Sequence, residues 1–201
     1  MYFQDNGCLC GMEPGGRQPA PGKLALVQAF VNTTDRIINQ ETLGNPEMLR
    51  AWLRSHDLLP GDEQLSGEDL EWALEVREAL RNLLLAHTGE QSDPQAIEVL
   101  NRGMGRAQLQ VRFQQNGAAY LEPGAQGLAR ALGTILLDAF AGMADGSWER
   151  LKVCRNEDCR WAFYDSSKNR SGAWCTMQVC GNRKKARTYR QRHQPVSDEQ
   201  A

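Results

Sequence analysis

The sequence contains little of what enzyme active sites are usually built from. It has only three histidines, His56, His87 and His193, and none has a nucleophile or carboxylate at a spacing typical of a catalytic motif. Gly103 and Gly105 lack the strand-turn-helix setting and the lysine of a phosphate loop. We therefore predict that the protein is not an enzyme and that its histidines are surface or capping residues.

Long apolar runs are also lacking. The most apolar window, residues 128–144, contains Arg130 and Asp138, so it is too short and too charged to span a bilayer. The amino terminus has no basic region followed by an apolar run, which a signal peptide would require. We therefore expect a cytoplasmic protein that has no membrane partner.

Apolar periodicity is absent from both ends of the chain. Residues 1–23 are rich in Gly and Pro, and we expect them to be disordered or partly left from a cleaved purification tag, which "YFQ" resembles. We assign no role to Cys8 and Cys10 in this arm. Residues 194–201 are expected to form a disordered tail.

Charge is unevenly distributed along the chain. Residues 150–193 hold twelve Lys or Arg and three acids, a charge of +9, so the net charge of −2 leaves −11 on the remainder. An acidic body with a basic end indicates two parts with different partners, the basic end facing a polyanion. A solvated charged face would normally mix the two signs more evenly.

The acidic part predicts a mostly helical (α+β) domain over residues 24–148. Apolar residues at helical spacing predict a first helix from Leu24 through Ile38. The second begins at the N-cap Asn45, followed by Pro46, and the third runs from a capping box at Ser66 to Gly89.

Further along the chain, one β signal lies between two more predicted helices. Asp93-Pro94 begins a helix that we expect to stop near Gly103. Alternating apolar residues on both sides of Asn116-Gly117 predict a short hairpin. Residues 125–144 predict a long apolar helix at the centre of the core.

Two cysteine pairs predict a metal site in residues 149–193. Cys154 and Cys159 share the spacing of Cys175 and Cys180, and fifteen residues separate the pairs. Four thiolates suit one structural zinc per chain and leave no open position for catalysis. A segment this short needs such a staple to fold by itself. Disulfides, four unrelated buried thiols and an iron–sulfur cluster are the alternatives.

A basic helix is predicted immediately after the last cysteine. Arg183, Arg187 and Arg190 fall in one row, which could read bases in a major groove. Further candidates for nucleic-acid contact widen this sector or lie in the loop between the cysteine pairs: Lys184, Lys185, Arg192, Lys168 and Arg170. The alternatives are a solvated basic tail and, for Lys168, a role in shaping its loop.

Polar residues interrupt the apolar faces of the helical domain. Asn32 and Thr33 interrupt the apolar face of the first predicted helix, and Arg77 lies on the capped third helix. Buried polar groups need partners, so these residues either bond one another or bind a ligand such as a small-molecule effector. We favour the structural interpretation.

Two stretches of the sequence resemble known families. "APGKLALVQAFVNTTD", followed by "REALRNLLL", resembles the ABATE domain. "CRNEDCRWAFYDSSKNRSGAWCTMQVCGNRKKARTYRQR" resembles the CGNR zinc finger, including the tetrad that begins at Cys180. The resemblance implies a stress-responsive transcriptional regulator of bacteria in which the finger, residues 149–193, binds nucleic acid.

Three functions remain open from the sequence. DNA-binding transcriptional regulation comes first, and a homodimer formed through the helical domain would suit two-fold symmetric operators. An RNA-binding or ribosome-associated protein is the second, because exposed Trp161, Phe163 or Tyr164 could stack on unpaired bases. A protein-interaction module is the third. Aromatics buried around the metal would favour duplex DNA over RNA.

Overall fold

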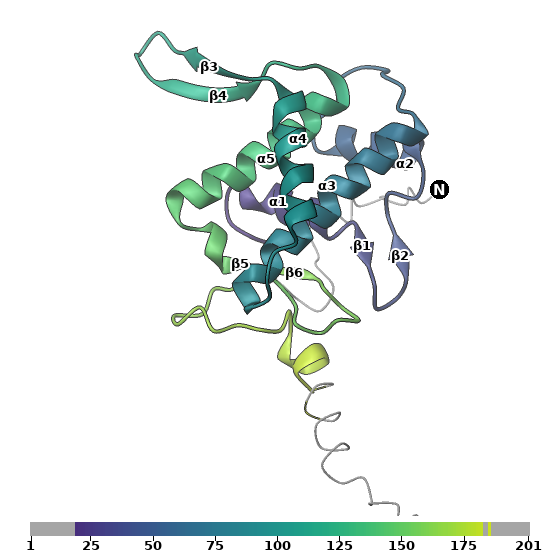
Figure 1. Cartoon of the computed structure of the whole chain (residues 1–201), viewed down its shortest axis with the longest axis vertical. Coiled ribbons are helices and arrows are strands. Elements are labelled where there is room, and N and C mark those ends of the chain that lie inside the picture. Colours follow the sequence, from purple (N-terminus) through teal and green to yellow (C-terminus); the bar gives the residue numbers. More distant parts are fainter. Residues whose placement is uncertain (1–18, 183–184, 186–201) are drawn as a thin grey trace, which may run out of the picture.

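The computed structural model describes residues 19–182 and 185, and its fold is mostly helical, as predicted (Figure 1). The main helices are α1 (Leu24–Val31), α2 (Pro46–Ser55), α3 (Gly67–Leu85), α4 (Pro94–Ala107) and α5 (Gly127–Asp145). The short helical turns are η1 (Ala86–Thr88), η2 (Trp148–Arg150) and η3 (Met177–Gly181), of which η3 is a π-helical turn. Antiparallel hairpins are formed by β1 (Thr34–Asp35) with β2 (Gln40–Glu41), β3 (Leu109–Phe113) with β4 (Ala119–Pro123), and β5 (Leu151–Val153) with β6 (Ala162–Tyr164).

The predicted helix starts are confirmed by their caps. The Asn45 side chain accepts a hydrogen bond from the Met48 amide at 2.9 Å, with Pro46 in the first turn of α2. At α3, Ser66 and Asp69 form the reciprocal capping box. These signals are local, so neighbouring residues alone decide them.

The predicted first helix is too long. α1 ends at Val31, and the Thr33 hydroxyl donates to the Phe30 carbonyl at 2.8 Å. The Asp35 carboxylate then accepts from the Ile37 amide at 2.9 Å and forms the turn between β1 and β2. Short polar side chains have therefore bonded to nearby backbone in place of helix continuation.

The predicted stop of the fourth helix at Gly103 is also wrong, because α4 continues to Ala107 and ends at Gln108 in a left-handed conformation, φ 50°. Gly103 is needed for packing instead. A Cβ at this position would lie 2.9 Å from Leu136 Cδ1 of α5. The glycine lets α4 and α5 approach closely.

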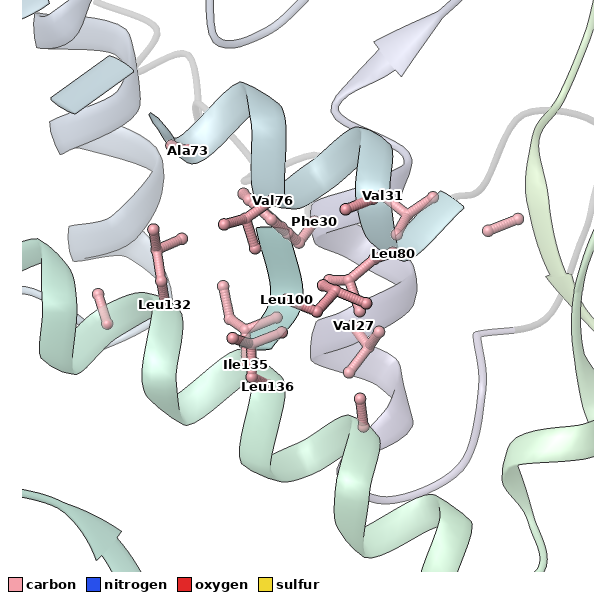
Figure 2. Close-up of a cluster of buried hydrophobic side chains, with 14 of the residues drawn as sticks. Val27, Phe30, Val31, Ala73, Val76, Leu80, Leu100, Leu132, Ile135 and Leu136 are labelled. Carbon is pink, nitrogen blue, oxygen red and sulfur yellow. The ribbon is translucent and has the colours of Figure 1, made fainter. Parts of the chain in front are cut away.

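The core lies where α1, α3, α4 and α5 meet, and Figure 2 shows its residues converging from these helices. Phe30 and Ile135 are fully buried in it, as are Leu80 and Leu132 to within about one per cent. By length and composition α5 could cross a membrane, yet 56% of its apolar window is buried in the protein, as in a core helix. The prediction of a central apolar helix is confirmed.

The carboxy-terminal hairpin shares this core. Leu151, Val153 and Ala162 belong to the same apolar cluster as the helices, and β5 contacts α3 and η1 while β6 contacts α1. The boundary predicted after residue 148 stays a prediction. The carboxy-terminal module therefore does not have an entirely separate core, because its hairpin is too short to bury these side chains by itself.

Candidate metal centre and nucleic-acid interface

The four predicted cysteines are brought together at one point. Cys154 follows β5, Cys159 lies in the turn before β6, and Cys180 lies in η3. The Sγ atoms of these three and of Cys175 all lie within 4.8 Å of one another, and all four residues are buried. The Cys159–Cys175 and Cys175–Cys180 sulfur pairs are each 3.6 Å apart, so neither pair is a disulfide.

This geometry fits a tetrahedral zinc site. Zn–S bonds of about 2.3 Å place the sulfurs of a tetrahedron about 3.8 Å apart, close to the observed spacing. Asn156 Nδ2 donates to Cys180 Sγ at 3.7 Å, the kind of supporting bond that orients a metal ligand. Four sulfurs would fill the coordination sphere, as in structural sites.

The thiols strongly perturb one another's ionisation. The hydrogen bond from Cys159 lowers the pKa of Cys154 to about 2, with further help from Cys175 and the Asn156 backbone. The same bond raises the pKa of Cys159 to about 12. Hydrogen bonding to Cys154 and then Cys159 raises the pKa of Cys175 in turn. Ionisation of one thiol thus disfavours ionisation of its neighbours. A bound divalent cation would offset this repulsion and allow all four cysteines to be thiolates.

Aromatic side chains cover the cysteine cluster. Trp161 and Phe163 are each 6% exposed and pack with the four cysteines in a second small core. Ile37, Trp174 and Val179 pack against it from outside. Ile37 comes from the β1–β2 turn, so the metal centre and the helical domain are in direct apolar contact.

The comparisons with known proteins agree with this arrangement. A family model for ABATE, described as "Putative stress-induced transcription regulator", matches residues 24–146, more than half of the chain. The chain belongs to the ABATE family. A CGNR zinc finger model matches residues 150–193 directly after it, so both predicted resemblances are confirmed and in the predicted order. No curated relative matches the chain at a significant level.

A buried ion pair shapes the CGNR finger beside the cysteines. Lys152 Nζ and Asp165 Oδ2 are 2.8 Å apart, with side chains 5% and 4% exposed. Burial raises the pKa of Asp165, but hydrogen bonds from Lys152, Ser167 and the Gly172 amide outweigh it and hold this pKa well below its usual range. Lys152 also donates to the carbonyls of Arg170 and Gly172. The pair therefore closes the loop that leads to Cys175.

Gly172 cannot be replaced without moving this pair. A Cβ on Gly172 would lie 2.8 Å from Cγ of Asp165, and the Gly172 amide donates to the same carboxylate at 2.7 Å. The sequence did not reveal this arrangement, because Lys152 stands in a short alternating stretch typical of a surface strand. Its partner is thirteen residues away with the metal turn between them.

Several basic residues of the CGNR finger dock it to the ABATE domain. Arg155 donates to the Thr88 carbonyl through Nε and Nη2, at 3.0 and 2.6 Å. Arg160 forms a two-point pair with the Glu90 carboxylate at 2.6 and 3.1 Å. These partners lie 67 and 70 residues away, so sequence spacing gave no signal of the contacts. Part of the basic charge of the finger therefore stabilises its contact with the ABATE domain and is not available to a polyanion.

The candidate nucleic-acid residues divide into three groups. Arg170 pairs with Glu149 and is engaged within the protein. Lys168 and Lys185 are exposed and have no ion pair among residues 19–182 and 185. The remaining candidates lie outside the described residues: Arg183, Lys184, Arg187, Arg190 and Arg192. Their role stays a prediction.

The candidate ligand residues of the ABATE domain bind other parts of the protein. Arg77 donates to the Thr33 hydroxyl at 3.0 Å and forms a two-point pair with Glu41 at 2.7 and 2.8 Å. Burial raises the pKa of Glu41, but the bonds from Arg77 outweigh it and lower the pKa overall. Asn32 bonds the backbone of Ala162 in β6. This arrangement supports the structural interpretation over ligand binding.

The two described histidines also have structural partners. His56 caps α2, where Nδ1 donates to the Trp52 carbonyl at 2.8 Å and the ring stacks on Trp52. His87 Nδ1 donates to the Leu151 carbonyl at 2.7 Å and links η1 to β5. His193 lies outside the described residues. Within the described part of the chain, both histidines are occupied by contacts that stabilise the fold.

Proposed function

We propose that the protein is a bacterial, cytoplasmic DNA-binding transcription regulator of the stress response. Its CGNR finger would hold one zinc through Cys154, Cys159, Cys175 and Cys180 and present the following basic helix to duplex DNA. The supporting observation is the burial of Trp161 and Phe163 against the cysteines. Trp161 and Phe163 in that position cannot stack on unpaired bases, and Tyr164 is partly buried against the helical core. The burial of these aromatics weakens the RNA-binding alternative.

The exposed charge supports the same proposal. Lys168 and Lys185 are exposed and have no ion pair within the described part of the chain, so they could meet phosphate, whereas Lys152, Arg155 and Arg160 are engaged in the protein. Arg183, Arg187 and Arg190 would read bases, and Lys184, Lys185 and Arg192 would meet phosphate. The family is of regulatory type, so we propose no catalytic role.

The ABATE domain would act as the dimerisation and sensor part of this regulator. A homodimer presents two fingers to a two-fold symmetric operator. A small-molecule effector would bind elsewhere than at Asn32, Thr33 and Arg77, because the hydrogen bonds of these side chains are made within the protein.

Titration of the zinc-loaded full chain against duplex DNA and single-stranded RNA at several salt concentrations tests the proposal. Alanine at Arg183, Arg187 or Arg190 should cost about 1–3 kcal/mol and relax preference at one base position. Alanine at Lys184 or Lys185 should weaken all sequences alike and lower the slope of log affinity against log salt by about 0.9.

Arg54→Ala on α2 provides the matched control, because it removes a partly exposed positive charge outside the finger. It should leave both affinity and salt slope unchanged. If every basic substitution lowered the affinity equally and the protein had no sequence preference, the basic residues would form only a surface that attracts polyanions. Tighter binding to RNA than to DNA would favour the RNA-binding alternative, and no binding to either would favour a protein-interaction module.

A further inference from the structure

The hairpin β3–β4 carries an apolar face that the protein leaves exposed. Its register pairs Val111 with Leu121 and Phe113 with Ala119, which places these four side chains on one side of the sheet. Val111 is 57%, Leu121 43% and Phe113 78% exposed. The opposite side carries the ion pair of Arg112 with Glu122. Figure 1 shows the hairpin projecting from the helical body at the end of the molecule away from η3.

The apolar surface continues across a groove onto α5. Val111 and Leu121 form one wall of the groove and Leu137 and Phe140 the other, and its volume is about 550 Å³. Phe140 is 51% exposed, and Met143, one turn further along α5, is 43% exposed. We define the hairpin face as Val111, Phe113, Leu121, Phe140 and Met143. A contiguous apolar patch of this kind marks an interaction site.

We propose that the hairpin face is the surface through which two copies of the chain associate. Each copy offers both a projecting apolar element, the hairpin with Phe113, and an apolar groove beside α5. A two-fold axis brings the projection of each copy to the groove of the other, which is the self-complementarity that an isologous interface requires.

Charges at the groove support a second copy as the occupant. Lys23 and Asp145 both line the groove and are exposed. Lys23 lies 3.5 Å from Asp138, yet its side chain is 72% exposed, so it remains accessible to a second carboxylate. In a two-fold pair, Lys23 of each copy meets Asp145 of the other. A lipid surface or a strongly acidic or basic partner would not match one charge of each sign.

The size of the face also fits a dimer. Side chains of this size, exposed to the observed degree, present on the order of 450 Å² per copy. A standard interface buries about 800 Å² per partner, of which somewhat more than half is apolar. The hairpin face therefore supplies about the apolar area that a stable dimer needs.

This inference deepens the proposed function and rests on the homodimer named there, but its test contains no nucleic acid. Failure to dimerise and failure to bind DNA are therefore separate results. Sedimentation of the zinc-loaded full chain at micromolar concentration should give twice the chain mass of 22.5 kDa. Phe113→Glu and Phe140→Glu should each raise the dimer dissociation constant about tenfold or more.

Ile38→Glu is the matched control, because Ile38 is 64% exposed in the β1–β2 turn, outside the hairpin face. It should leave the dissociation constant unchanged. Far-ultraviolet circular dichroism should show the same helix content in all three variants, since the replaced side chains are largely exposed. A wild-type monomer, or dimers that tolerate both phenylalanine substitutions, would overturn the proposal.

Mixing two charge variants tests the pairing at the groove. Lys23→Glu and Asp145→Lys should each weaken the homodimer by placing like charges together. In the mixture, the heterodimer restores both opposite-charge contacts, so association should recover. No recovery in the mixture would contradict the two-fold arrangement.

Discussion

The side-chain amide of Asn32 pairs with the backbone of Ala162 in both directions. Nδ2 donates to the Ala162 carbonyl at 2.9 Å, and Oδ1 accepts from the Ala162 amide at 2.8 Å. The side chain of the residue that ends α1 thus bonds the edge of β6 as the backbone of a neighbouring strand would. Together with Arg155 and Arg160, it fixes the finger to the helical domain.

Replacing Asn32 should loosen this contact. Asn32→Ala leaves the buried Ala162 amide without this partner, while the carbonyl keeps the Gln28 donor at 3.3 Å, so we expect a loss of about 1–3 kcal/mol in the free energy of unfolding. Amide hydrogen exchange at Ala162 should become faster, whereas exchange in α4 should not change. Asn101→Ala, an exposed asparagine on α4, is the control and should change stability little. Unchanged protection at Ala162 would contradict the role assigned to Asn32.

The buried pair of Lys152 and Asp165 predicts an acid-sensitive stability. Because the folded pKa of Asp165 is depressed, its contribution is present above its unfolded pKa of about 4 and is lost as pH falls toward the lower folded value. Asp165→Asn should cost about 3 kcal/mol at neutral pH by leaving Lys152 without its charge partner. The difference between wild type and variant should shrink below pH 4.

Chemical denaturation across this pH range measures both effects. Glu149→Gln removes the acid of an exposed pair with Arg170, and its effect should stay within about 0.5 kcal/mol at every pH. A constant difference between wild type and Asp165→Asn down to pH 2 would mean that ionisation of Asp165 does not contribute.

Loss of one thiol should release the metal. Purified protein should carry one zinc per chain, and Cys159→Ser or Cys180→Ser should abolish binding, measured by elemental analysis. Trp161 should then become exposed, with a red-shifted fluorescence, because its cluster consists largely of the cysteines. The signal of the main helices should persist, since the hairpin residues Leu151 and Val153 remain in the helical core.

Cys8→Ser is the control for this experiment, because it removes a thiol from a position to which we assign no metal. Zinc content should stay at one per chain. Acid titration should release zinc cooperatively as protons compete for the thiolates. If zinc-free protein had an unchanged tryptophan fluorescence spectrum, a structural role of the metal would be contradicted.

Two glycines in helices should respond to alanine in opposite directions. Gly133 of α5 packs on α4, where a new Cβ would lie 2.5 Å from Cβ of Ala107, so Gly133→Ala should destabilise by about 1–3 kcal/mol. Beyond its own helix, no described residue has an atom within 4 Å of that position at Gly105 of α4, and Gly105→Ala should stabilise by about 0.5–1 kcal/mol. Thermal unfolding measures both, and a destabilised Gly105→Ala would contradict the open space described there.

The features predicted correctly from sequence are those decided by near neighbours. The Asn45 cap, the Ser66 box and the Asn116-Gly117 turn each depend on a few adjacent residues. The end of α1 was misjudged because the local bonds of Thr33 and Asp35 compete with the helix, and a distant contact supports them: Thr33 also accepts from Arg77 of α3, 44 residues away. Ile37, assigned to a helical stripe, packs against the metal cluster instead.

The same distinction holds at the candidate site. The repeated spacing of the four cysteines was enough to predict the metal site, because metal ligands must converge in any fold of the surrounding chain. Arg155 and Arg160 appeared only as part of the basic charge, since their acceptors in the ABATE domain are far away in sequence. A charge count gives the total but not how many side chains are already engaged.

The apolar contacts of β5 and β6 limit how the finger can be transplanted. Leu151, Val153 and Ala162 would face water if residues 150–193 were fused to an unrelated protein, even with zinc bound. A graft would therefore have to bring the surfaces of α1 and α3 that receive them, or replace these three side chains with polar ones. In this protein the finger is not an interchangeable cassette, because its hairpin needs the helices beneath it to bury these side chains.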